Sequence, residues 1–237
     1  MKIVSVIGLI SAFLLAIIVY LTTNNYIFAL VFLFIFLGYF MVIAYKMIKK
    51  YLSRKQRCHD CYKFINSFLI TMSVKESLTE SFSSGTINAS LDFKNELSEL
   101  ENMVVEDRII YLRRYFNLAI YKMFLNVLNI YQEQGGNILS MSESLMHEST
   151  LVEESVNKSS NIGIKKLTEF LILWILTFFV LLFMRFGMKE FYLNMINNNM
   201  FIACLLIFFL FFVLSFHLFL INFTKLAIKE DNINEED

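Results

Sequence analysis

The sequence predicts an all-α, polytopic membrane protein with four transmembrane helices and a cytoplasmic antiparallel helical bundle. Hydrophobic residues make up 57% of the 237 positions, whereas soluble domains hold roughly 45–50%. The excess is gathered in four apolar blocks rather than spread along the chain. Between the second and third blocks lies a charge-rich region whose apolar residues recur every three or four positions, which is the period of a helix.

Each apolar block is long enough to cross a bilayer as a helix, which takes about 20 residues. A lone strand would leave its backbone groups unpaired in lipid. We expect spans at Ile3 to Leu21, Tyr26 to Tyr45, Leu167 to Phe186 and Met200 to Phe223. The predicted domains are an N-terminal transmembrane hairpin (1–45), a cytoplasmic helical domain (46–166), a C-terminal transmembrane hairpin (167–223) and a cytoplasmic acidic tail (224–237).

Basic residues set the predicted orientation. Six cations follow the second span between Lys46 and Arg57, whereas the 22–25 turn carries no charge. Because positively charged loops stay in the cytoplasm, both termini are predicted to be cytoplasmic, with the segment from Arg185 to Asn199 outside. The alternative is that the first span is a cleaved signal peptide, but the sequence before Asn24 shows a weak basic region and no small-residue cleavage site.

Two long helices are expected in the second half of the central domain. The first carries one apolar stripe and the second carries another. Gly135, Gly136 and Asn137 separate them, a stop signal followed by a helix N-cap residue. The stripes consist of Ile109, Leu112, Phe116, Ile120, Met123, Val127 and Ile130, and of Ile138, Met141, Leu145, Val152 and Val156.

The first half of the central domain shows weaker helical patterns. Phe64, Phe68 and Met72 continue the second span as one stripe. The segment from Ser73 to Glu76 has the spacing of a capping box and predicts the start of a helix, which the run 83–85 would end. Residues 87–102 predict a short helix with loops at both ends, and no strand pattern of useful length occurs.

The sequence contains no motif of a nucleotide-binding, metalloprotease or serine-hydrolase site. We therefore predict that the chain is not an enzyme and that it has no catalytic residue, cofactor or metal. Its net charge of zero gives no reason to expect nucleic acid. Cys58, His59, Asp60 and Cys61 form the one metal-like cluster, but structural zinc usually needs four ligands. Two reduced thiols on one helical face are favoured, with palmitoylation as an alternative.

Three further polar features lie in or near the spans. His217, with Ser215, is a candidate for a proton path, but no carboxylate partner is evident in a neighbouring span. Glu169 is expected to pair with Lys165 or Lys166. Arg113 and Arg114 are either a docking site for an acidic partner or a solvated helix face.

The order of parts resembles the type II secretion system F-domain family, the inner-membrane platform proteins of type II secretion and type IV pilus machines. The single central domain is most similar to the TadB and TadC proteins of Tad pilus machines. The resemblance is strongest over the segment 131–139, then at Leu145 and through Ser160 into the third span. The chain departs from the family by lacking glycine at Met72 or Ser73 and proline in the third span.

The resemblance implies a non-enzymatic platform in the plasma (inner) membrane that couples a secretion ATPase to the extraction of pilin or pseudopilin and to filament assembly. It also implies a second platform protein or further copies of the chain as partners, besides the lipid bilayer. Gly135, Gly136 and Asn137 would be structural turn residues, and Glu133, Arg113 and Arg114 would contact a partner.

Two other classes of protein stay open. A four-span transporter subunit would show polar or broken helices at mid-membrane, whereas these spans consist mostly of Leu, Ile and Phe. A signalling protein with a helical cytoplasmic domain would usually carry a larger outer domain than these short loops supply.

Overall fold

The computed structural model describes residues 2–225, and this part of the chain is helical with no β-strand. The predicted acidic tail lies, from residue 226 onward, outside the described residues. The described chain divides into two compact units: unit 1 contains residues 2–51 and 161–225, and unit 2 contains residues 52–160. The boundaries between the units fall within α3 (Tyr45–Lys75) and α8 (Ile138–Gly187).

Four helices among the described residues are long and apolar enough to cross a membrane, as the sequence predicts. The predicted spans lie in α1 (Lys2–Thr23), in α2 (Tyr26–Tyr39) with its continuation into α3, in the second part of α8, and in α10 (Asn199–Phe223). The structure therefore supports a multi-pass membrane protein.

Unit 1 packs its apolar helices around large side chains. Its core comprises Ala12, Leu15, Val19, Phe32, Phe36, Trp174, Phe178 and Phe209. Asn24 (φ +53) reverses the chain between α1 and α2, and the side chain of Asn25 accepts a hydrogen bond from the Ile27 backbone N–H. Thr22 and Thr23 donate their hydroxyl protons to helix carbonyls at 2.9 and 2.7 Å, so that no buried hydroxyl is left unpaired at the end of α1.

The second span is not a uniform α-helix. Between α2 and α3 the chain forms a π-helical segment, η1 (Phe40–Ala44). The ring of Phe40 lies against Gly8 of α1, where an added Cβ would come within 2.0 Å of the ring. The sequence does not predict this segment, because nothing in the apolar pattern distinguishes a π turn from an α turn.

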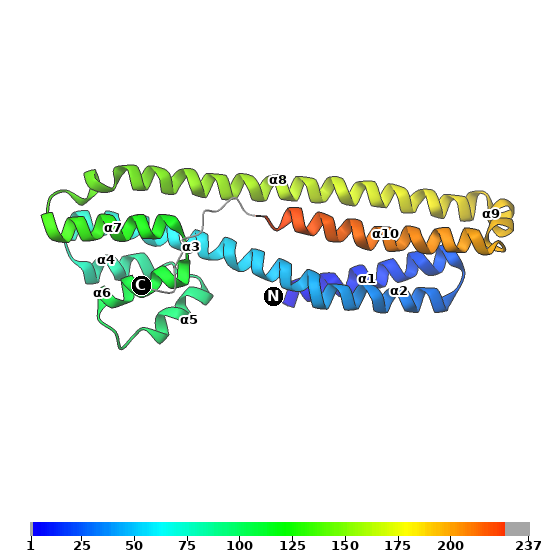
Figure 1. Ribbon diagram of the computed structural model, residues 1–237, viewed down its shortest axis with the longest axis horizontal. Coiled ribbons are helices and arrows are strands. Elements are labelled where there is room, and N and C mark those ends of the chain that lie inside the picture. Colours follow the sequence, from blue (N-terminus) through cyan, green and yellow to red (C-terminus); the bar gives the residue numbers. More distant parts are fainter. Residues whose placement is uncertain (1, 226–237) are drawn as a thin grey trace. The chain divides into compact units, whose positions relative to one another are not determined.

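The segment predicted as a loop between the third and fourth spans contains a short helix, α9 (Lys189–Ile196). It follows α8 after Met188 and precedes α10 (Figure 1). Tyr192 anchors it, with only 3% of its surface exposed and its ring 5.9 Å from that of Phe201.

Unit 2 consists of the second part of α3, the first part of α8 and the helices between them. These are α4 (Leu78–Thr86), α5 (Leu91–Glu99), α6 (Val105–Phe116) and α7 (Ala119–Gln134). Phe64 of α3 is fully buried at their centre. Six aromatic rings have centroids 5.7–6.2 Å from its own, those of Phe68, Phe82, Phe93, Phe116, Tyr121 and Phe124.

The stripe from Ile109 to Ile130 does not form one helix, so this prediction is wrong. Asn117 adopts a left-handed conformation (φ +49) that ends α6, and α7 starts two residues later. Asn tolerates this conformation better than most residues. Because of this turn, α7 does not bury the side that the stripe predicts. Its buried residues include Tyr121, Phe124 and Leu128. Met123 and Ile130, which the stripe would bury, are about 40% exposed.

The predicted capping box at Ser73 to Glu76 is also wrong. The Ser73 hydroxyl donates to the Ile70 carbonyl inside α3, and Glu76 (φ +49) ends that helix. The N-cap of α4 is instead Ser77, which accepts a hydrogen bond from the Glu80 backbone N–H. The sequence thus contains two Ser-x-x-Glu patterns, and the second one, from Ser77 to Glu80, starts the helix.

Helix α4 ends at Thr86, one residue after the predicted end at residues 83–85; Gly85 itself also serves packing. It lies inside α4 and is buried. A Cβ at this position would meet the Phe64 ring at 2.7 Å, so the glycine permits close packing between α4 and α3.

We expect Phe64→Ala to destabilise unit 2 by about 3–5 kcal/mol, because it leaves a cavity among six rings. Hydrogen exchange of the α3, α6 and α7 amides in the full chain measures this loss as faster exchange. Ile110→Ala is the matched control, because Ile110 is 62% exposed on α6. Equal effects of the two substitutions would contradict the central role of Phe64.

Candidate functional site

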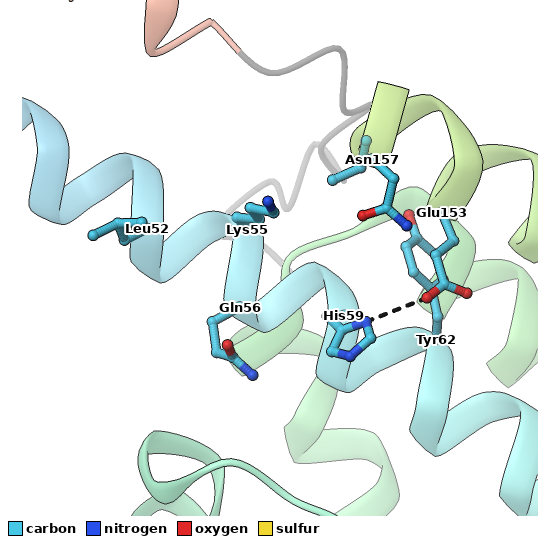
Figure 2. Close-up of a pocket in the computed structure, with 8 residues that line it drawn as sticks. Leu52, Lys55, Gln56, His59, Tyr62, Glu153 and Asn157 are labelled. Atoms are coloured by element: carbon cyan, nitrogen blue, oxygen red, sulfur yellow. Dashed lines mark ion pairs between the residues drawn. The ribbon is translucent and has the colours of Figure 1, made fainter. Parts of the chain in front are cut away.

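The main candidate site in unit 2 is a groove of about 400 Å³ between α3 and α8. Polar side chains from both helices line it, and Figure 2 shows His59 of α3 directed toward Glu153 of α8. The polar residues are Lys55, Gln56, His59, Glu153 and Asn157, and the others are Leu52, Tyr62 and Val156. Because α3 presents Lys55, Gln56 and His59 within little more than one turn, one helix supplies most of the donors.

Two polar contacts connect α3 with α8 along this groove. His59 Nδ1 lies 3.3 Å from Glu153 Oε1 (Figure 2), and both side chains are partly exposed. Lys55 Nζ donates to Ser160 Oγ at 2.7 Å. Partly exposed pairs of this kind contribute about 0–1 kcal/mol. Their main effect is therefore to set which residues of the two helices face each other.

The cluster from Cys58 to Cys61 does not converge on one site. Cys58 and Cys61 are fully buried in the aromatic core, Asp60 is also buried, and His59 faces the groove. Neighbouring positions on a helix point in different directions. No group of three or more potential metal ligands occurs within residues 2–225.

The two buried thiols are also poor nucleophiles. Burial raises the pKa of Cys58 to about 11, although a hydrogen bond from its Sγ to the Tyr62 hydroxyl opposes the shift, and burial raises the pKa of Cys61 well above its usual range. Thiols with raised pKa values stay protonated at neutral pH. The geometry therefore offers no cysteine–histidine pair for covalent catalysis.

Asp60 has a role that sequence reasoning missed. Its Oδ2 accepts a hydrogen bond from Ser90 Oγ at 2.5 Å, and its Oδ1 accepts one from Gln56 Nε2 at 3.2 Å. Ser90 is the N-cap of α5 and accepts in turn from the Phe93 backbone N–H. A buried carboxylate thus fixes the start of α5 against α3. The run Ser90–Leu91–Asp92 carries an N-cap signal, but nothing in the sequence connects it with Asp60.

The predicted turn residues form one continuous turn between α7 and α8. Gly135 has φ +68 and ψ −161, a region open essentially to glycine alone. Gly136 also has a positive φ of 106°. Asn137 Oδ1 accepts hydrogen bonds from the backbone N–H groups of Leu139 and Ser140, which caps the start of α8.

The predicted partner-contact residues do not form one patch. Arg113 and Arg114 lie in the last turn of α6, just before the reversal at Asn117. Glu133 lies in the last turn of α7, beside the glycine turn. At 1.5 Å per residue, the length of α7 separates these positions by roughly 20 Å. Arg114 and Glu133 are exposed, and Arg113 is half-buried. Their role as partner contacts stays a prediction.

His217 of α10 has a partner that the sequence did not reveal. Its Nδ1 lies 3.2 Å from the hydroxyl of Tyr39, which directly precedes η1. The pair joins two apolar helices of unit 1 and contains no carboxylate. Glu169 is exposed, and within residues 2–225 no ion pair joins it to Lys165 or Lys166, contrary to the prediction.

Comparison with known proteins adds no relative. The chain matches no protein-family model, no curated protein and no solved structure.

We expect Gly135→Ala to destabilise the α7–α8 turn by about 1–3 kcal/mol, because alanine cannot adopt this backbone conformation without strain. No atom lies within 4 Å of a Cβ built at Gly135, so the effect would come from the backbone alone. Hydrogen exchange at the end of α7 and the start of α8 measures it. Gly38→Ala is the control, because Gly38 is helical, has equal free space and has no positive φ. Equal exchange in Gly135→Ala and the wild type would contradict the strain argument.

Proposed function

We propose that the chain is a platform protein of a type IV pilus-like (Tad) or type II secretion machine. The observation that carries the proposal is the order of parts: a helical unit of residues 52–160 is inserted between two pairs of apolar helices. The glycine turn at Gly135 and Gly136 supports it, because the resemblance to the F-domain family is strongest around that turn.

In this proposal unit 2 is a cytoplasmic antiparallel helical bundle, and the membrane is the plasma (inner) membrane. The cations from Lys46 to Arg57 favour this orientation, because positively charged segments next to a span stay in the cytoplasm. Both termini are then cytoplasmic, and α9 lies outside.

The proposed mechanism transmits movement through α3 and α8. Within residues 2–225, the chain passes between the two units in these helices. A secretion ATPase bound to unit 2 would shift it, and α3 and α8 would pass the shift to the spans, as in other rigid-body transitions. The span of α8 exposes large apolar side chains such as Ile172, Ile175 and Phe179. These would face lipid, pilin, a second platform protein or another copy of the chain.

Orientation is tested with impermeant maleimide on intact cells. We expect Glu190→Cys on α9 to react in intact cells and Lys122→Cys on α7 to react only after permeabilisation. Both positions are exposed in the structure. Both substitutions are made in a Cys204→Ser chain, because Cys204 is exposed, whereas Cys58 and Cys61 give little background because they are buried. Labelling of Lys122→Cys in intact cells would refute the cytoplasmic assignment of unit 2.

Partner binding is tested by co-purifying the full chain with the secretion ATPases of the same genome. We expect one ATPase to bind, and Arg113→Glu/Arg114→Glu to weaken binding about tenfold, because like charges across an interface repel. Lys94→Glu is the matched control, since Lys94 is an exposed cation on α5.

The platform function and the contact assigned to Arg113 and Arg114 are tested by different outcomes. Binding that withstands the double charge reversal contradicts only the contact assigned to Arg113 and Arg114. If no ATPase binds the wild-type chain, the platform function itself is contradicted.

A further inference from the structure

A second cavity, of about 330 Å³, lies within unit 1. The α1–α2 turn, the end of α8 and α9 supply its walls. Its lining combines four polar side chains that can donate hydrogen bonds, Asn24, Arg185, Lys189 and Tyr192, with three apolar ones, Phe186, Leu193 and Ile196. Neither the proposed platform role nor the resemblance uses this cavity.

The hydrogen-bond donors of the cavity are only partly satisfied. Arg185 Nη2 donates to Asn24 Oδ1 at 3.1 Å. Arg185 Nη1 and the Tyr192 hydroxyl are both buried, and neither has a hydrogen-bond partner within residues 2–225. A buried donor without a partner costs about 1–3 kcal/mol. Two such donors beside one cavity indicate a ligand that accepts hydrogen bonds.

The charge of the lining indicates that the ligand is an anion. Arg185 and Lys189 are cationic, and no carboxylate lines the cavity, since Glu190 is not among its residues. Burial raises the pKa of Tyr192 despite the opposing effect of the Arg185 charge, so its hydroxyl stays a proton donor at neutral pH. Arginine matches phosphate especially well, because its planar group donates two parallel hydrogen bonds.

The position of the cavity indicates that the phosphate belongs to a lipid headgroup. Arg185 stands at the end of the apolar segment of α8, where a spanning helix meets the headgroup region. Phe183, Phe186 and Phe191 are more than half exposed around it. The apolar lining of Phe186, Leu193 and Ile196 fits the start of an acyl chain beside the headgroup.

We propose that this cavity binds the phosphodiester of an anionic phospholipid headgroup, with Arg185, Lys189 and Tyr192 as donors. An arginine that merely extends to interfacial water would need no second donor. Here a second donor, the Tyr192 hydroxyl, belongs to the same lining as Arg185 and is buried with no hydrogen-bond partner within residues 2–225. In this assignment the exposed Lys189 ammonium and the unpaired Nη1 of Arg185 both donate to the phosphate. The bound lipid would fix α9 against the α1–α2 turn.

Native mass spectrometry of the full chain in an uncharged detergent tests this assignment. The probes are phosphatidylglycerol and a diacylglycerol with the same acyl chains, which lacks the phosphate. We expect the wild type to prefer phosphatidylglycerol, Arg185→Gln to lose about tenfold in affinity and Tyr192→Phe about threefold. Lys165→Gln is the control, because Lys165 is an exposed cation elsewhere on α8 in unit 1.

Three results would overturn the proposal. The first is equal binding of both lipids by the wild type. The second is unchanged phosphatidylglycerol binding by Tyr192→Phe, which keeps the ring in place and so stays informative if Arg185→Gln does not fold. The third is displacement of the lipid by millimolar inorganic phosphate, which would assign the cavity to free phosphate instead.

Discussion

The packing of aromatic rings around Phe64 is the constraint on which the rest of unit 2 depends. Phe64 contacts rings from α4, α5, α6 and α7, so one side chain of α3 touches every short helix of the unit. Gly85 lets α4 come close enough for this contact. Aromatic pairs at these distances add roughly 0.5–1.5 kcal/mol each beyond the burial of their surface. Short helices that would be unstable alone are therefore held by α3.

Polar groups then determine how the surrounding helices are placed. Asp60 fixes the N-terminus of α5 through Ser90, while His59 and Lys55 face Glu153 and Ser160 on α8. Cys58 and Cys61 thus lie in the core, Asp60 contacts α5 and His59 faces the groove. What resembles a metal site in the sequence is a set of separate contacts made by consecutive residues of one helix.

The apolar pattern predicted the coarse fold well because span length and hydropathy are local properties. All four apolar helices and the helix break at Gly135 to Asn137 could be read from it. The break at Asn117 could not, because the apolar spacing runs through it without interruption. The start of α4 was misplaced because two Ser-x-x-Glu patterns compete, and only the left-handed Glu76 decides between them. The partners of Asp60 and His217 depend on tertiary packing, about which local spacing holds no information.

The π-helical segment η1 has a consequence for how the second span tolerates change. A π turn holds one residue more than an α turn, and each residue of an α-helix advances the side-chain direction by about 100°. Loss of any one residue between Phe40 and Ala44 could therefore be absorbed by a return to α geometry. The helix would stay unbroken, and Tyr39 and Tyr45 would keep nearly the same relative facing. The π segment thus lets the span hold one extra residue without changing the angle between the Tyr39 hydroxyl, which meets His217, and the basic stretch that follows.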